Sequence, residues 1–521
     1  MANREDLAII RAARAGQADA QLTLGKRYLF GGNGLPQSLG TAFHWLERAA
    51  RQGLSDAWML IAQHIPYEVV MPLAKPQEAA LWYERAFDAG LVKAGLVFAR
   101  LALGNVAQIS ADMKSKAIHA LEAVAREGDA DAQWLLAQQG ETVQAPVATP
   151  QPDQAAMPEP DAARQWTRKA ADAGIEQAQH ALAEAAWHQS DIPGFRERAQ
   201  PLADALLRHH APLLGQLSAP ADIPAISLGA QHITLLGRLA QVHLDERKPD
   251  IAHVQQLLEL AALAGDREAQ LALGLLYARM DAHGARRYAG QGSANYKKAI
   301  RWLTLAGEQG MAAAWYALSR IYLKPEFSQR NLADVQHYLE RAAEMGHRAA
   351  QLECGMSAWR NRRDDPANDV RALYWLQKAA TQGEAQARAL LEKVADRPAA
   401  LPWTVAARAQ LTRELTNAYP FLAARIELAV LFGLTRPEAL LIDLKEADCG
   451  HCLMVDIRAH YARSKRRLIL IETGEERGAL NRIGRLFEDV DCGVTGPEGN
   501  YRQRLYRLKT ALPAAVGGDE D

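Results

Sequence analysis

A short phrase that recurs along the chain constrains its fold more than any other feature of the sequence. The phrase places an aromatic residue eight positions before a glycine, as in WLERAARQG at 45–53. Five variants follow: WYERAFDAG (82–90), WTRKAADAG (166–174), WLTLAGEQG (302–310), YLERAAEMG (338–346) and WLQKAATQG (375–383). Internal periods of about 20–50 residues are typical of solenoids and other repeat architectures. We therefore expect a stack of similar units rather than one central core.

The residues around each closing glycine keep fixed positions. An alanine stands four residues after every glycine, and a second small residue stands nine residues after most of them. The glycines are Gly16, Gly53, Gly90, Gly128, Gly174, Gly265, Gly310, Gly346 and Gly383. Glycine commonly closes a helix, and small residues let a second helix approach. The pattern predicts units of two helices, with the aromatic column in the core and neighbouring units burying each other's apolar faces.

These columns resemble a known repeat family. The pattern A-x-x-x-L-G-x-x-Y occurs at 20–28 and 269–277, and a G-x-G loop stands at 32–34. Together with the recurring phrase, they resemble the Sel-one-like repeat (SLR) family, an α-solenoid relative of the tetratricopeptide repeat, over about residues 1–395. The resemblance implies a protein that scaffolds complexes through protein partners and has no catalytic residues or cofactor.

Proline-rich stretches and a change in composition predict the domain boundaries. Residues 1–139 form a first block of SLR repeats, and 140–160 form a proline-rich linker. Residues 161–395 form a second block, whose segment 190–226 is expected to be irregular because it contains five prolines. Residues 400–515 lack the repeat and form an α+β accessory domain. The predicted fold class is mainly α: an α-solenoid of helix-turn-helix repeats with a small α+β C-terminal domain.

The C-terminal segment alternates helical and strand-like patterns. Thr435 is expected to cap a helix that has Pro437 and Glu438 in its first turn. Two β-branched, alternating stretches predict strands. The predicted helices are 404–417, 421–432, 434–446, 474–490 and 501–512, and the predicted strands are 453–461 and 466–472.

Two motifs of this segment resemble the first half of a tyrosine-recombinase (integrase) catalytic domain. FGLTRPEALLIDL (432–444) is similar to the family's G-L-x-R-x-E-A motif, and SKRRLILI (464–471) is similar to its lysine-bearing hairpin. The resemblance implies that Arg436 holds a phosphate and that Lys465 contacts a base or protonates the leaving group. No H-x-x-R box follows and no tyrosine stands in a nucleophile context, so we expect no recombinase activity.

A nucleic-acid contact through this segment remains an alternative. Twelve basic residues stand against eight acidic ones between 453 and 510, and phosphates attract basic clusters. The opposing interpretation is an ordinary solvated hairpin and a basic amphipathic helix. The candidate contacts are Arg436, Arg458, Arg463, Lys465, Arg466 and Arg467.

The tetrapeptide CGHC at 449–452 offers two further chemistries. A redox role needs the motif to follow a strand and open a helix, whereas here a helix precedes and a strand follows. A zinc site could instead use thiolates and an imidazole. Its ligands would be Cys449, His451, Cys452 and Cys492, and the alternative is four ordinary reduced thiols.

The remaining features exclude other classes of function. The formal net charge of −1 gives the whole chain no attraction to nucleic acid or membranes. The charged start, MANREDLAIIRAARAG, and the lack of a long apolar run argue against a signal peptide or membrane span, so we expect a cytoplasmic protein. YAGQGSANYKK (288–298) does not fit a phosphate loop, and His209, His210 and the other histidines show no metal-ligand spacing. The leading prediction is a non-catalytic adaptor for a protein partner, and the rival is a nucleic-acid-binding adaptor.

Overall fold

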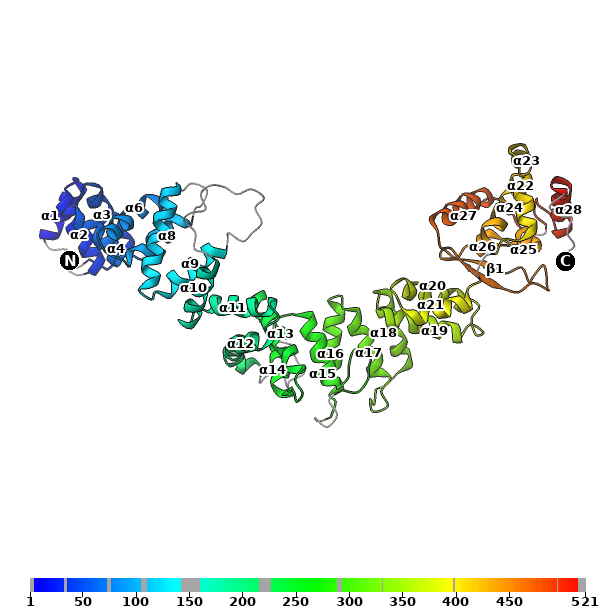
Figure 1. Ribbon diagram of the computed structural model, residues 1–521, viewed down its shortest axis with the longest axis horizontal. Helices are drawn as coiled ribbons and strands as arrows, with labels where there is room; N and C mark the ends of the chain where they lie inside the picture. Colours follow the sequence, from blue (N-terminus) through cyan, green and yellow to red (C-terminus); the bar gives the residue numbers. More distant parts are fainter. Residues whose placement is uncertain are drawn as a thin grey trace. The chain divides into compact units, whose positions relative to one another are not determined.

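The fold is described from a computed structural model, in which the chain forms two compact units, Met1–Leu260 and Ala261–Asp521 (Figure 1). The described residues are 4–31, 35–72, 76–104, 110–141, 160–214, 226–287, 293–329, 331–396, 399–493 and 495–513.

All helices and strands named in the described part of the first unit are helices. The helices are α1 (Arg4–Arg14), α2 (Ala18–Phe30), α3 (Leu39–Arg51), α4 (Ser55–His64), α5 (Tyr67–Val70), α6 (Pro76–Asp88), α7 (Ala94–Leu103), α8 (Ala111–Arg126), α9 (Ala130–Glu141), α10 (Pro160–Asp172), α11 (Glu176–His188), α12 (Ile192–Leu214), α13 (Ala230–Leu244) and α14 (Ile251–Leu263), the last of which runs to the boundary.

The second unit continues the repeats and ends in the mixed domain. Its repeat helices are α15 (Arg267–Ala278), α16 (Tyr296–Glu308), α17 (Ala312–Tyr322), α18 (Leu332–Glu344), α19 (Arg348–Arg360), α20 (Asn368–Thr381) and α21 (Ala385–Val394). The elements that follow are α22 (Pro402–Gln410), α23 (Arg413–Ala418), α24 (Pro420–Phe432), α25 (Arg436–Leu441), α26 (Leu444–Ala447), β1 (Cys452–Val455), β2 (Arg467–Leu470), α27 (Gly474–Phe487) and α28 (Tyr501–Ala511).

The glycine turns are confirmed. All nine repeat glycines have φ between 87° and 97°, the left-handed region in which a side chain is strained. The alanine four residues later lies in the next helix and is fully buried in most units, as Ala57, Ala178 and Ala387 illustrate. Each turn therefore ends one helix and starts the next in a fixed orientation.

The second small column lets two helices meet at very short range. A Cβ atom added to Gly25 in α2 would lie 2.7 Å from the side chain of Leu46 in α3. The same substitution at Gly274 in α15 would bring Cβ within 2.6 Å of Leu303 in α16. The leucine of the W-L phrase thus fills the space that the absent side chain leaves free, which explains both columns together.

A glutamine column, which the sequence analysis did not identify, links neighbouring helix pairs of the repeat. Gln21, five residues after its glycine, donates from Nε2 to the carbonyl of Ala13, eight residues earlier, at 3.1 Å. Its Oε1 accepts from Gln52 of the following turn at 2.7 Å. Gln133, Gln179, Gln270 and Gln351 repeat the first bond at 3.0–3.2 Å, and Trp315 donates from Nε1 in the same way. Each of these carbonyls also accepts from the backbone N–H of its turn glycine, so the side chain supplies a second hydrogen bond to the same oxygen.

The aromatic column is core in only some of the units. Trp82 and Trp302 are 4% exposed, whereas Trp45 and Trp375 are half-buried. In three repeats, those of Trp45, Trp82 and Trp166, the basic residue three positions later lies over the ring. Arg48 lies 5.3 Å from the ring centroid of Trp45, for example. The amphipathic side chains therefore seal the edge of the stack as well as filling its interior.

The expectation that residues 190–226 are irregular is wrong for most of this segment. α12 runs for 23 residues through Pro201 and Pro212. A proline removes one backbone donor, but Phe195, Ala199 and Leu202 are buried at helical spacing and hold α12 against its neighbours. The prolines therefore did not disrupt the unit. Three features of the sequence fall outside the described residues wholly or largely: most of the proline-rich linker 140–160, the G-x-G of 32–34, and 288–292.

The C-terminal domain has its own core around two antiparallel strands. Cys452 pairs with Leu470 and Val455 pairs with Arg467 in the two-stranded sheet. Both strands are shorter than the sequence predicted. Phe432, Phe487 and Leu508 are fully buried in the core cluster of this domain. The mainly α fold class is confirmed, with the small sheet confined, among described residues, to this part.

Local capping accounts for the helix boundaries in this domain. The expected helix 404–417 is divided into α22 and α23, because Thr412 accepts a hydrogen bond from the backbone N–H of Leu415 and starts a new helix. The expected cap of α25 is confirmed: Thr435 and Glu438 form a capping box, and the backbone N–H of Thr435 donates to Glu438 at 2.8 Å.

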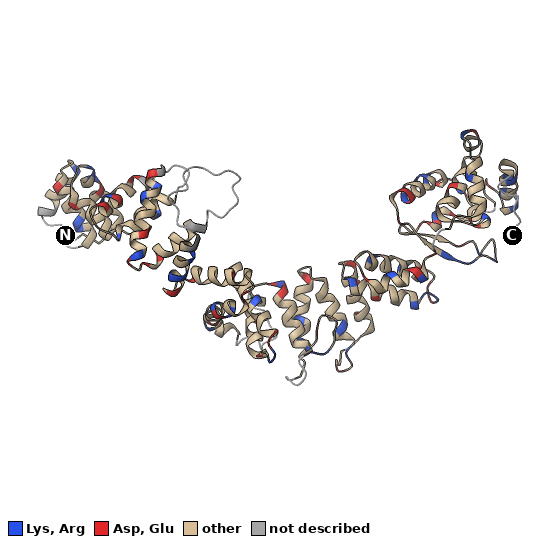
Figure 2. Ribbon diagram, viewed as in Figure 1, with Lys and Arg blue, Asp and Glu red and all other residues tan. Residues whose placement is uncertain are grey.

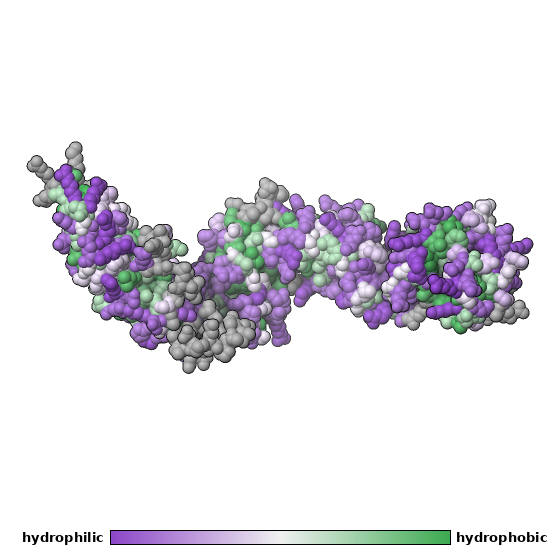
Figure 3. Space-filling model, turned by 90° about the horizontal axis from the view of Figure 1, so that it is seen from above, coloured by the Kyte–Doolittle hydropathy of each residue, from purple (hydrophilic) through white to green (hydrophobic). Residues whose placement is uncertain are grey.

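Positions of acidic and basic residues are scattered along the helices of both units (Figure 2). Hydrophobic surface is visible between hydrophilic side chains in Figure 3. None of the described helices has the length and apolar character needed to cross a membrane.

Candidate functional site

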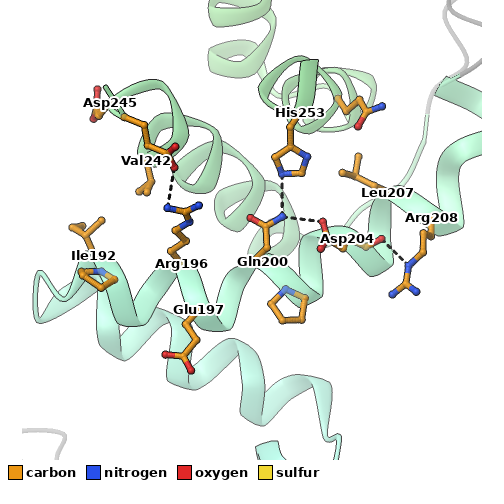
Figure 4. A pocket seen from close by; sticks show the side chains of 14 residues that line it. Ile192, Arg196, Glu197, Gln200, Asp204, Leu207, Arg208, Val242, Asp245 and His253 are labelled. Carbon is orange, nitrogen blue, oxygen red and sulfur yellow. Dashed lines mark hydrogen bonds and ion pairs between the residues drawn. The ribbon is translucent and has the colours of Figure 1, made fainter. Parts of the chain in front are cut away.

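A groove of about 1280 Å³ runs along α12 and is bordered by α13 and α14 (Figure 4). We call it the α12 groove. Its lining residues are Ile192, Pro193, Arg196, Glu197, Gln200, Pro201, Asp204, Leu207 and Arg208 from α12, Val242, Asp245 and Glu246 from α13 and its end, and His253 and Gln256 from α14.

The amphipathic pattern of α12 determines which side chains line the groove. Phe195 and Ala203 are buried on one side of the helix, where the ring of Phe195 packs edge-on against Trp187 of α11 at 5.0 Å. Residues 193, 196, 200, 204 and 207 lie on another face at helical spacing. The neighbouring helices pack against the buried face of α12, so the face that lines the groove is left uncovered.

Caps place the helices that border the groove. Asp191 accepts a hydrogen bond from the backbone N–H of Gly194 at 3.0 Å at the start of α12. Asp250 accepts from the backbone N–H groups of Ala252 and His253 at the start of α14. The second of these caps sets the position of His253 at the edge of the groove.

The side chain of Gln200 connects the three helices at the floor of the groove. Its Nε2 lies 2.9 Å from Asp204 Oδ1 and 3.0 Å from His253 Nε2. Its Oε1 lies 2.9 Å from Nε2 of the buried His243 in α13. Since one side chain satisfies partners on all three helices, Gln200 holds the walls at a fixed separation.

The charges of the groove are mixed, with an acidic excess. Four carboxylates line it, those of Glu197, Asp204, Asp245 and Glu246, against the two guanidinium groups of Arg196 and Arg208. Arg196 spans the groove to Glu246 at 3.0 Å. The exposed rim therefore favours a ligand with positive charge.

Apolar side chains supply the remaining surface of the groove. Ile192 is 39% exposed, and Leu207 and Val242 are half-buried. The described lining residues include no hydroxyl or thiol side chain that could act as a nucleophile. A surface of this kind is suited to binding a peptide segment, in which apolar anchors supply contact and charges supply orientation.

The CGHC residues lie at the junction of α20 with the C-terminal hairpin. His451 Nε2 lies 2.9 Å from the carbonyl oxygen of Val370 in α20 and 3.6 Å from Cys452 Sγ. A hydrogen bond from Cys452 lowers the pKa of Cys449 to about 7, and the same bond together with burial raises the pKa of Cys452.

The four sequence-predicted zinc ligands are not brought together as one set. Cys452 belongs to the cluster that packs on the last repeat, whereas Cys492 is buried in the core of the C-terminal domain. Among described residues, their candidate ligand atoms do not form a group in mutual proximity. None of the four cysteines, Cys354, Cys449, Cys452 and Cys492, forms a disulfide.

The structure places the predicted nucleic-acid contacts around the hairpin, where carboxylates neutralise several of them. Arg458 lies 2.6 Å from Asp456, Arg466 lies 2.8 Å from Asp369, and Arg467 lies 2.7 Å from Glu438. The last pair ties the hairpin to the capping box of α25.

The other three predicted contacts lie apart from these ion pairs. Arg463 and Lys465 are exposed in the hairpin connection, and Arg436 is half-buried at the start of α25. The positive charge available for phosphates is therefore smaller than the sequence count indicates, and nucleic-acid binding stays a prediction.

The sequence analysis did not identify the residues that line the groove. Gln200, Asp204 and Leu207 lie in the segment that was expected to be irregular, so no face was assigned to them. A helical reading of 192–214 that tolerated Pro201 would have placed them on one side.

The paired helices, left-handed glycine turns and shared contacts between neighbouring units define an α-solenoid, a class of protein that presents extended binding surfaces. A family model, the Sel1 repeat, matches residues 18–54, 73–91, 156–175, 267–311, 312–347 and 349–384. The chain therefore contains Sel1-like repeats, and proteins with such repeats commonly act in protein–protein interaction. The matches end before residue 400, so the recombinase resemblance of 400–515 stays a prediction.

Solved structures of repeat proteins are similar to this chain at low identity. A protective antigen of uropathogenic Escherichia coli with an SLR fold is 17% identical over 99% of this chain and 98% of its own, with a TM-score of 0.45. A Sel1 repeat protein from Oxalobacter formigenes is 19% identical over 75% of this chain and 90% of its own, with a TM-score of 0.23. A similar protein from Klebsiella pneumoniae is 20% identical over 52% and 95%, with a TM-score of 0.15. No curated protein matches the chain.

Proposed function

We propose that this protein is a non-catalytic scaffold that binds a partner protein in the α12 groove, with residues 400–515 as a second interaction module. The observation that carries the proposal is the groove itself: about 1280 Å³ of open space with apolar walls and an acidic rim, on a chain of Sel1 repeats. On sequence grounds we place this activity in the cytoplasm.

The walls indicate the kind of segment that would fit. Apolar side chains of the partner would contact Ile192, Leu207 and Val242, and lysine or arginine residues beside them would meet Glu197 and Asp245. An amphipathic helix presents both kinds of side chain at once. Gln200 would keep the groove open in the unbound protein, which reduces the entropic cost of ordering it on binding.

Affinity capture with matched variants tests this proposal. The intact protein and a Leu207→Glu variant would be used to capture partners from the native lysate, with quantitative mass spectrometry. Leu207→Glu puts a charge on an apolar wall that already carries an acidic excess, so a partner that uses the groove should fall at least tenfold in yield. Ile192→Glu should act in the same direction.

Leu332→Glu serves as the control, because Leu332 is exposed at the start of α18 and lies outside the groove. This variant should recover the same partner at the wild-type level. If Leu207→Glu and Ile192→Glu both capture the same partners as the wild type, the groove is not the binding surface and the proposal fails.

A further inference from the structure

Two histidines and a carboxylate from separate helices converge on the side of α11 and α13. Glu176 and His180 are one turn apart on α11, and His232 lies in the first turn of α13. Among the residues that the structure describes, they form the one set of three whose candidate ligand atoms all lie within 4.8 Å of one another. His180 and His232 are far apart in sequence, so no spacing motif indicated them.

The distances between the three side chains are compatible with one shared ligand. Glu176 Oε1 lies 2.8 Å from His232 Nε2 and 4.0 Å from His180 Nε2. The two imidazole centroids are 4.7 Å apart with an interplanar angle of 64°. A tetrahedral zinc ion with bonds of about 2.0–2.2 Å holds its ligand atoms roughly 3.3–3.6 Å apart. Small side-chain rotations would bring all three atoms to that separation.

One of the three candidate ligand atoms has no hydrogen-bond partner among the described residues. His180 is only 8% exposed, and its buried Nε2 accepts and donates no hydrogen bond among the described residues. A buried polar atom without a partner costs about 1–3 kcal/mol, and an ion is one of the few ways to satisfy it. The orphaned nitrogen is adjacent to the carboxylate and the second imidazole, so it points to a shared ligand rather than to simple packing.

We propose that Glu176, His180 and His232 bind a divalent first-row transition-metal ion, with zinc as the best fit. Two imidazole nitrogens and one carboxylate oxygen are a donor set that suits zinc and its neighbours, whereas calcium and magnesium prefer oxygen ligands alone. Glu176 is more than half exposed, so the ion can enter from solvent, and a water molecule can complete the coordination.

The ion would act as a clamp between two helices. In its absence, the hydrogen bond from His232 to Glu176 is the direct polar link between α11 and α13 at this position. Coordination replaces that single exposed bond by three bonds to one centre and engages the buried nitrogen of His180. Since α13 also forms one wall of the α12 groove, the metal would stabilise that wall.

Neighbouring charges leave the site free for a cation. Glu184, one turn after His180, is already paired with Arg238 at 2.6 Å and with His188 at 3.0 Å. The carboxylate of Glu176 is therefore the anionic group that faces the two imidazoles. One anionic and two neutral ligands would leave a net positive charge on the bound centre, which favours a coordinated water or a further anion.

Calorimetric titration with zinc chloride tests the site directly. Full-length protein, free of purification tags and stripped with a chelator, would be titrated in a Cys449→Ser background, so that the CGHC segment cannot bind zinc through a pair of thiolates. We expect one equivalent of zinc to bind. His232→Asn and Glu176→Gln each remove a ligand and should weaken binding by more than about 100-fold, beyond the loss typical of outer-shell changes.

A spectroscopic readout and a histidine control complete the experiment. Cobalt(II) bound to His232, His180 and Glu176 in a tetrahedral site should give strong visible absorption, which His232→Asn should abolish. His209→Ala removes an exposed histidine of α12 and should leave both the titration and the cobalt spectrum unchanged. Circular dichroism confirms that each variant is folded.

Two outcomes would overturn the proposal. The first is the absence of a zinc binding isotherm and of a cobalt spectrum in the Cys449→Ser protein that keeps all three ligands. The second is a titration that His232→Asn and Glu176→Gln leave unchanged, which would place the ion elsewhere. Either result would reduce the three side chains to a hydrogen-bonded pair beside a buried histidine.

Discussion

Arg425 and Glu498 form a bidentate ion pair in the interior of the C-terminal domain, with N–O distances of 2.9 and 2.6 Å. Their side chains are only 1% and 4% exposed. The remaining guanidinium nitrogen of Arg425 donates to the carbonyls of Ala439 and Ile442, both at 3.0 Å. This pair joins α24, the end of α25 and the loop before α28, which are distant in sequence.

Removing one partner of this pair should destabilise the C-terminal domain strongly. Arg425→Ala leaves the carboxylate of Glu498 buried beside Arg504 alone, which lies 3.8 Å away. Breaking a buried pair on one side typically costs about 3–5 kcal/mol. Hydrogen–deuterium exchange should show faster exchange in α24 and α28, while the repeat helices keep their protection.

The matched control is Arg482→Ala. Arg482 pairs with Glu427 on the surface of the same domain, and an exposed pair contributes at most about 1 kcal/mol. Exchange in α24 should stay near the wild-type rate. Equal acceleration by the two substitutions would show that burial of the Arg425 pair does not set its contribution.

Gly25→Ala should destabilise the first repeats, although alanine ordinarily favours a helix. The added Cβ would lie 2.7 Å from Leu46 and 3.3 Å from its backbone nitrogen, so α2 and α3 must separate. Overpacking of this kind costs about 1–3 kcal/mol. Thermal unfolding followed by exchange in α2 and α3 measures the effect.

Gly40→Ala tests whether the contact, rather than the residue type, is responsible. Gly40 lies in α3, and a Cβ there would contact nothing within 4 Å. The substitution should be neutral or stabilise the protein by about 0.4–1 kcal/mol. A loss of stability as large as that of Gly25→Ala would contradict the close-approach explanation.

The repeat could be predicted from the sequence because each conserved position within the chain has one local cause. Gly53 and Gly346 must have positive φ, and Gly25 must lack a side chain, so the same residue types recur wherever the same geometry recurs. The capping box of Thr435 and Glu438 was predictable for the same reason: its two bonds lie within one turn.

The candidate sites could not be predicted in this way, because they depend on tertiary contacts. His180 and His232 are separated in the sequence by α12 and come together only in the folded protein. No spacing between them in the sequence indicates that contact. Gln200 lies one residue before Pro201, in a segment whose prolines suggested irregular structure although burial of Phe195 and Ala199 keeps it helical. The sequence analysis assigned no role to Gln351, because its hydrogen bonds reach residues outside its own helix.

Gln351→Leu should destabilise the α18–α19 unit despite its similar volume. Gln351 is 3% exposed and donates from Nε2 to the carbonyl of Ala343 at 3.0 Å. It also accepts from Gln382 at 2.9 Å. Leucine would remove both bonds, although the Ala343 carbonyl would still accept from the backbone N–H of Gly346 at 3.0 Å. The loss of a hydrogen bond of this kind costs about 0.5–1.5 kcal/mol. Chemical denaturation monitored by circular dichroism measures the change.

Gln336→Leu is the corresponding control on the same unit. Gln336 is exposed on α18, and its side chain donates to Glu340, one turn along the same helix, at 2.7 Å. Its loss should change stability by less than about 0.5 kcal/mol. If the two leucine variants unfold at the same denaturant concentration, the glutamine column does not contribute to stability through its carbonyl bond.

Acid should weaken the second unit through His347, the N-cap of α19. The imidazole stacks on Tyr316 at 4.3 Å, and its Nδ1 accepts from the backbone N–H of Ala350 at 3.3 Å. Burial is the main cause that lowers the pKa of His347 to about 4, and the nearby charges of His283, Arg348 and Arg320 lower it further, while Glu353 opposes them. The cap therefore requires the neutral imidazole.

The direction of the pH effect follows from this lowered pKa. The unfolded chain binds a proton to His347 near its ordinary pKa of 6.5, whereas the folded protein resists protonation down to about 4. The stabilisation is therefore complete above pH 6.5 and is lost as the pH falls from 6.5 to 4. Allowing for partial exposure, we expect about 1–2 kcal/mol of unfolding free energy to be lost over this range.

His347→Asn keeps a capping oxygen but cannot titrate, so its denaturation midpoint should depend less on pH than that of the wild type. His337→Asn replaces an exposed histidine of α18 and should retain the full dependence. A wild-type pH profile that His347→Asn reproduces without change would assign the acid sensitivity to other groups.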